Sequence, residues 1–144
     1  LHDDKFVSNT ASPPIANLDS LPSPYLMGLC DKFLDDKKIT PLIQVARGCP
    51  FKCTFCQEGD DYYNKIRRFS FSRVKDELSY LAKKSTVSSL SITDSNFGMY
   101  KEDLIFAKEL SSVREKYNWN SVELLPKHHH PTTVNYRILL PNTL

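Results

Sequence analysis

Short apolar runs that alternate with helical patterns between residues 41 and 126 restrict the fold more than any other feature of the chain. The first run, residues 42–46, is bounded by a proline and a glycine and predicts a buried strand. Residues 88–94 contain β-branched side chains, alternate in polarity and predict a second strand. Residues 119–125 suit a third strand. Because strands separated by helices form parallel sheets through right-handed crossovers, the pattern predicts an α/β fold.

Two amphipathic helices are predicted between these strands. Ser70 or Ser72 can cap the start of the first helix, because a serine side chain accepts a hydrogen bond from a free backbone N–H there. The second helix is expected over residues 101–117. The predicted apolar faces consist of Val74, Leu78 and Leu81 in the first helix and Phe106, Leu110, Val113 and Tyr117 in the second.

The regions on either side of this core differ from it. Residues 1–40 hold four prolines, each of which lacks a backbone N–H and fixes φ. We expect residues 1–40 to form a proline-rich linker, with a short helical piece around residues 28–34. Residues 41–126 form the predicted core, and residues 127–144 form an unassigned tail without a periodic signal.

Composition excludes several classes of protein. The chain has 144 residues, of which 40% are hydrophobic and 25% charged, as in soluble globular proteins. A net charge of +2 gives no indication of nucleic-acid binding. We expect no membrane span, because no apolar run approaches the ~20 residues that cross a bilayer, and no signal peptide. Clustered cysteines without a secretion signal favour a reducing compartment, so the cytoplasm is the expected location.

Three of the four cysteines, Cys49, Cys53 and Cys56, fall within eight residues, in the loop after the first predicted strand. Their spacing is Cys-x3-Cys-x2-Cys, and the fourth cysteine, Cys30, stands apart. Three thiolates this close can hold three irons of a four-iron cluster, which leaves the fourth iron with an open position. Clusters that only carry electrons usually have four cysteine ligands. The spacing therefore indicates a cluster that binds a substrate or cofactor directly.

The motif, with Phe55 before its last cysteine, resembles that of the radical S-adenosylmethionine superfamily. The resemblance implies that Cys49, Cys53 and Cys56 are the ligands of a 4Fe-4S cluster and that Phe55 lies near the adenine of S-adenosylmethionine. It further implies cleavage of S-adenosylmethionine to a 5′-deoxyadenosyl radical. A reductant such as flavodoxin or ferredoxin and an unknown substrate would be the partners. The implied fold is the N-terminal portion of a partial βα (TIM) barrel.

A narrower resemblance, over about residues 15–125, is to cobalamin-dependent members of that superfamily. It rests on residues 18–25 before the first strand, on residues 67–70, on the start of the following helix, and on residues 94–97. In parallel α/β sheets, ligands bind outside the carboxyl ends of the strands. Asp94, Ser95 and Asn96 follow the second strand, so we expect them to contact the methionyl part of S-adenosylmethionine. In those members a proline-rich linker joins an N-terminal cobalamin-binding domain to the barrel, so the resemblance implies cobalamin as a cofactor of the full-length protein. Only two βα units and a further strand are readable here, so we expect the sequence to be a fragment.

Other interpretations of the same residues remain open. The three cysteines could form a structural zinc site with Cys30 or a histidine of residues 128–130, although the spacing matches no common zinc finger. Cys53 and Cys56 could be a redox pair, which leaves Cys49 unexplained. An electron-transfer iron–sulfur module is a further alternative. Asp94 and Asn96 could simply cap the turn after their strand, and Arg67 and Arg68 suit surface positions or carboxylate partners. No catalytic side chain is assigned.

Overall fold

The computed structural model of the chain describes residues 11–119 and 121–124. The unassigned tail over residues 127–144, with its three histidines, lies outside these residues. No helix in the described part of the chain is both long and apolar enough to cross a membrane.

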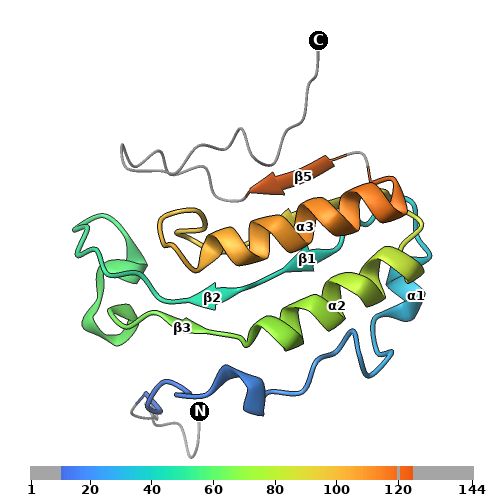
Figure 1. The fold of residues 1–144 in the computed structure, drawn as a ribbon. Helices are drawn as coiled ribbons and strands as arrows, with labels where there is room; N and C mark the ends of the chain where they lie inside the picture. Colours follow the sequence, from blue (N-terminus) through green and yellow to red (C-terminus); the bar gives the residue numbers. More distant parts are fainter. Residues whose placement is uncertain (1–10, 120, 125–144) are drawn as a thin grey trace, which may run out of the picture.

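A parallel sheet of three strands forms the centre of the fold (Figure 1). Strand β4 (Ser89–Ile92) lies in the middle, and β1 (Leu42–Ile43) and β5 (Ser121–Leu124) pair with its two edges. The crossover helices are α2 (Phe71–Lys84) and α3 (Asp103–Tyr117). The predicted α/β class with parallel strands is therefore confirmed, whereas closure into a partial barrel stays a prediction.

Helices α2 and α3 pack against each other on one face of this sheet (Figure 1). The Ser70 side chain caps α2 by accepting a hydrogen bond from the Arg73 N–H at 3.2 Å, as the sequence predicted. Asn118, in the left-handed conformation with φ of 54°, ends α3. Both predicted apolar stripes face the core, whose buried members include Val74, Leu78, Leu81, Leu90, Ile92, Phe106, Leu110, Val113 and Trp119, with Tyr117 packed against them.

The strand predicted over residues 42–46 is in fact two strands. After β1 the chain leaves the parallel sheet, and β2 (Ala46–Arg47) pairs antiparallel with β3 (Arg67–Arg68). Asp94 causes the break, because its carboxylate accepts the N–H groups of Val45 at 2.7 Å and of Ala46 at 2.9 Å. These two donors are therefore used by a side chain, and the prediction of one continuous strand was wrong.

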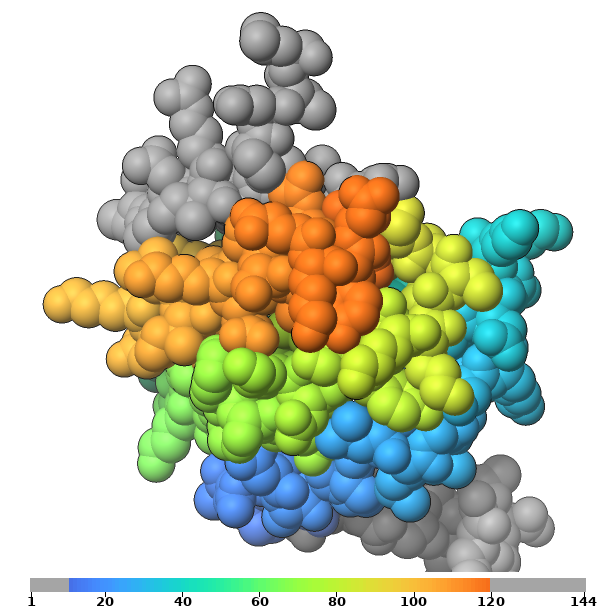
Figure 2. Space-filling model, turned by 45° about the vertical axis from the view of Figure 1, so that its right-hand side comes forward, coloured from blue at the N-terminus to red at the C-terminus, as the bar shows by residue number. Residues whose placement is uncertain are grey.

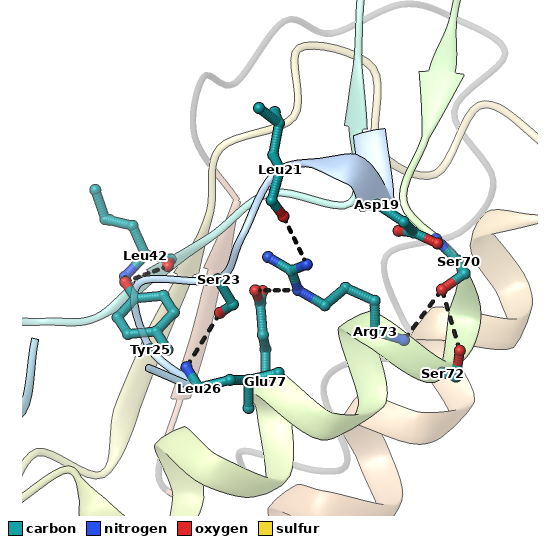
Figure 3. Close-up of polar contacts among 10 residues, drawn as sticks. All are labelled: Asp19, Leu21, Ser23, Tyr25, Leu26, Leu42, Ser70, Ser72, Arg73 and Glu77. Atoms are coloured by element: carbon teal, nitrogen blue, oxygen red, sulfur yellow. Dashed lines mark hydrogen bonds and ion pairs between the residues drawn. The ribbon is translucent and has the colours of Figure 1, made fainter. Parts of the chain in front are cut away.

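Residues 17–26, which we call the N-terminal strap, run along α2 (Figures 1 and 2). At its end the strap contacts the open edge of β1 through Tyr25. Figure 3 shows the contacts that hold the strap. The Asp19 carboxylate accepts the N–H of Ser70 at 3.0 Å, and the Arg73 guanidinium donates to the Leu21 carbonyl at 2.9 Å. The Tyr25 hydroxyl lies 2.7 Å from the Leu42 carbonyl oxygen, to which it donates. These contacts give the proline-rich segment a fixed place on the core.

Two short helical pieces precede β1. The 3-10 helix η1 (Leu18–Ser20) begins the strap, and helix α1 (Asp31–Leu34) follows it. The expected helical piece around residues 28–34 is therefore confirmed at its carboxyl end. Leu34 is buried in the same core as α2, which brings this segment against the sheet domain. The division of the chain at residue 40 stays a proposal.

Candidate functional site

The predicted ligand cysteines lie on residues 48–65, which we call the cysteine loop, between β2 and β3. The two ends of the loop are held together, because the Cys49 N–H donates to the Tyr63 carbonyl oxygen at 2.8 Å. Gly48 has φ of +102°, and a Cβ there would lie 2.4 Å from the Lys65 carbonyl oxygen. Only glycine suits both the conformation and the close approach. The strand pair β2–β3 thus continues into a loop that is closed at its base.

The interior of the cysteine loop is a series of tight turns. The Cys56 N–H donates to the Cys53 carbonyl at 3.1 Å, and the Gly59 N–H donates to the Cys56 carbonyl at 3.0 Å. Two 3-10 helices, η2 (Gln57–Gly59) and η3 (Asp61–Tyr63), complete the loop. The Asp60 side chain caps η3 by accepting the Tyr62 N–H at 2.8 Å. The sequence predicted a loop here but not these turns.

All three motif cysteines are free thiols, with Cys53 exposed and the other two half-buried. Cys53 and Cys56, together with Tyr62 and Tyr63, line an open hollow of about 940 Å³ in the cysteine loop. Among the described residues, the structure gathers no three side chains of metal-ligating type around one point. Phe55 is 86% exposed beside them. The assignment of the three thiols as cluster ligands and of Phe55 as an adenine contact therefore stays a prediction.

Asp94 follows the carboxyl end of β4 and binds the backbone at the break between β1 and β2. Only 6% of it is exposed, and its two oxygens each accept a backbone N–H, from Val45 and from Ala46. Burial raises the pKa of Asp94 to about 7, although the two N–H donors act in the opposite direction. The nearby Asp103 carboxylate also raises this pKa, to a smaller extent. The carboxylate is thus bound to the backbone of the fold, and its contact with a cofactor stays a prediction.

Asn96 connects the end of β4 with the start of the cysteine loop. Its Nδ2 lies 3.4 Å from the carbonyl oxygen of Gly48, the residue before Cys49. Ser95 is half-buried between Asp94 and Asn96. A small cavity of about 10 Å³ separates the two segments and is lined by Gly48, Asp94 and Asn96, among others. The structure therefore brings the predicted residues after β4 next to the cysteine motif, although they lie far apart in sequence.

A buried ion pair that the sequence analysis did not identify supports this arrangement. The Arg68 guanidinium donates to the Asp103 carboxylate at 2.5 Å and lies over the Tyr100 ring at 5.0 Å. Asp103 also accepts the N–H groups of Gly98 at 2.9 Å and of Tyr100 at 3.1 Å. The interpretation of Arg68 as a carboxylate partner was right. Asp103 gave only a weak signal, as an acidic residue in the first turn of a helix.

Comparisons with known proteins give similarity over most of the chain. The chain is 33% identical over 105 residues to the cobalamin-dependent radical SAM methyltransferase TokK of Streptomyces tokunonensis. This aligned segment makes up 69% of the chain and 15% of TokK. The chain is 34% identical over 98 residues to the 2-(S-pantetheinyl)-carbapenam-3-carboxylate methyltransferase of Streptantibioticus cattleyicolor, over 65% of the chain and 14% of that protein.

A third relative has a different activity. The anaerobic magnesium-protoporphyrin IX monomethyl ester cyclase of Rubrivivax gelatinosus is 29% identical over 111 residues, which make up 75% of the chain and 20% of the cyclase. No protein-family model matches the chain. The similar segment thus spans a fifth or less of each of these three relatives.

Proposed function

Since this chain belongs to the radical S-adenosylmethionine superfamily, we propose that it is the cofactor-binding portion of a larger radical S-adenosylmethionine enzyme. The observation that carries the proposal is the position of its three-cysteine motif. The motif follows β2 at the carboxyl end of the parallel strands, and Asn96 joins it there to the end of β4. Ligands of parallel α/β sheets bind at this end of the strands.

The residues present fit a 4Fe-4S cluster with three protein ligands. Cys49, Cys53 and Cys56 supply three thiol groups on one loop, and the backbone of that loop is already folded into tight turns. When bound, such a cluster supplies the electron that cleaves S-adenosylmethionine to give the 5′-deoxyadenosyl radical. The chain's own contribution is to present the three thiolates on a loop closed at its base by Gly48.

Ser95, Asn96 and Phe55 are proposed to contact S-adenosylmethionine. Ser95 and Asn96 lie beside the cysteine motif, where they can bind the methionyl part, and the exposed Phe55 ring can stack on the adenine. Asp94 takes part by holding Val45 and Ala46, because both of its oxygens already accept backbone N–H groups. We further propose that the described βα units begin a partial barrel. Cobalamin is proposed as a cofactor of the full-length protein.

Anaerobic reconstitution with iron and sulfide tests the proposal. We expect about four irons per chain and a spectrum that changes when S-adenosylmethionine is added. Cys53→Ala should abolish the cluster, whereas Cys30→Ala, which removes a thiol outside the motif, should retain it. A chain that binds about one zinc and no iron would overturn the proposal in favour of a zinc module. A cluster whose spectrum does not change when S-adenosylmethionine is added would indicate an electron-transfer module instead.

A further inference from the structure

We propose that Gly59 is a positioning residue, which fixes Cys53 relative to Cys56 because its lack of a side chain leaves room for the Cys53 backbone. This role deepens the proposed function, on which it rests. A Cβ placed on Gly59 would lie 2.3 Å from the carbonyl oxygen of Cys53 and 3.1 Å from its nitrogen. Non-bonded heavy atoms settle near 3.5–4.0 Å, so an alanine here would displace Cys53 by roughly 1 Å.

The backbone conformation of Gly59 is not the reason for a glycine at this position. The glycines with positive φ in the described chain are Gly28, Gly48 and Gly98, so Gly59 has a conformation open to other residues. The atoms that exclude a side chain are those of the Cys53 peptide group. Glycine is therefore required at position 59 because any side chain there would displace the Cys53 backbone.

The displaced atom is also the one that connects two motif cysteines. A Cβ at Gly59 would clash with the Cys53 carbonyl oxygen. The same oxygen accepts the Cys56 N–H at 3.1 Å. The Gly59 N–H donates to the Cys56 carbonyl at 3.0 Å, so backbone hydrogen bonds link Cys53 to Cys56 and Cys56 to Gly59. One added methyl group would thus displace Cys53 and disturb the contact that fixes Cys53 relative to Cys56.

Arsenite provides a test that requires no iron, because trivalent arsenic binds up to three thiolates. The measurements use the full chain with Cys30→Ala, so that only Cys49, Cys53 and Cys56 remain. We expect Gly59→Ala to weaken arsenite binding about 100-fold, the effect of losing simultaneous engagement of a third donor. The control is Gly28→Ala, which places a residue at φ of +72° but meets no atom closer than 3.7 Å. It should leave arsenite binding unchanged.

A second pair of variants separates positioning from general damage to the fold. In a chain that also carries Cys53→Ala, only two thiols remain, and Gly59→Ala should weaken arsenite binding no further. An additional loss in that background would overturn the proposal, as would unchanged binding in the first comparison. Loss of the far-ultraviolet helical signal in Gly59→Ala would also overturn it, because Gly59 would then serve folding as a whole.

The outcome for Gly59 is distinguishable from that for the proposed function. A chain that assembles no cluster, but shows the expected arsenite results, would refute the proposed function and retain the role of Gly59. A chain that assembles the cluster, and whose Gly59→Ala variant binds arsenite and iron as the parent does, would refute the role of Gly59 alone.

Discussion

Removal of the Asp103 carboxylate should destabilise the fold more than the loss of any exposed ion pair. Asp103→Ala deprives the Arg68 guanidinium of its partner at 2.5 Å, and it also removes the acceptor for the N–H groups of Gly98 and Tyr100. The Asp103 side chain is 3% exposed and that of Arg68 is 21% exposed. The carboxylate is thus almost fully shielded from water, whereas the guanidinium is partly hydrated.

The size of the effect follows from these contacts. Breaking a fully buried pair costs about 3–5 kcal/mol, and the partial hydration of Arg68 reduces this to about 2–3 kcal/mol. The two lost backbone hydrogen bonds cost about 1 kcal/mol each, or less where water replaces the acceptor. We therefore expect Asp103→Ala to lower the free energy of unfolding by about 4 kcal/mol, a large part of the ~5–15 kcal/mol typical of a domain.

Urea denaturation followed by tryptophan fluorescence measures this loss. Trp119 is the single tryptophan of the chain and is buried in the core, so its emission reports unfolding. Asp61→Ala is the control, because its pair with Lys52 has a similar distance of 2.6 Å but side chains that are 74% and 68% exposed. This variant should unfold at the same urea concentration as the parent.

A double-mutant cycle with Arg68→Met isolates the ion pair from the backbone contacts of Asp103. Asp103→Ala should cost clearly less in the Arg68→Met background than in the parent. An equal cost in both backgrounds, or a loss below about 1 kcal/mol in the parent, would refute the importance of the pair.

Three further outcomes are expected. Burial raises the pKa of Asp94 in the folded state to about 7 from its ordinary value of 3.8, so the folded state binds the proton more tightly than the unfolded state does. Stability should therefore fall as pH rises between these values. Asp94→Asn should flatten that slope in urea titrations at several pH values, and an unchanged slope would contradict the assignment. Tyr25→Phe should cost about 1–2 kcal/mol in the same denaturation assay through lost contacts to Leu42, with the exposed Tyr62→Phe as control. Leu78→Ala should cost about 2–5 kcal/mol, because Leu78 is fully buried, and a smaller loss would indicate a poorly packed core.

Features that depend on neighbouring residues could be predicted from the sequence. Ser70 caps α2 through the N–H three residues later, and the apolar stripe of α2 repeats along a single helix. The alternation of elements likewise predicted that the strands pair in parallel. These features are local because helix capping and amphipathicity are decided within a few turns of one element.

Features that depend on distant residues could not be predicted. The split of the first strand requires Asp94, which is 49 residues from Val45, and the support of the 94–103 segment requires Arg68, 35 residues from Asp103. Gly59 gave no signal either, because its requirement comes from the approach of the Cys53 peptide group and not from its own conformation. The motif of the candidate site was thus readable, but the contacts that shape the site were not.

The Tyr25 hydroxyl satisfies the backbone groups at the open edge of β1. The Pro41 and Ile43 carbonyls pair with β4, so the N–H and carbonyl of Leu42 point to the opposite, open edge of β1. Tyr25 occupies both of them, as it donates to the Leu42 carbonyl at 2.7 Å and accepts the Leu42 N–H at 3.3 Å. An exposed strand edge invites pairing with another chain, and a side chain that satisfies it prevents such pairing. The strap side of β1 is therefore closed to pairing with another strand at Leu42.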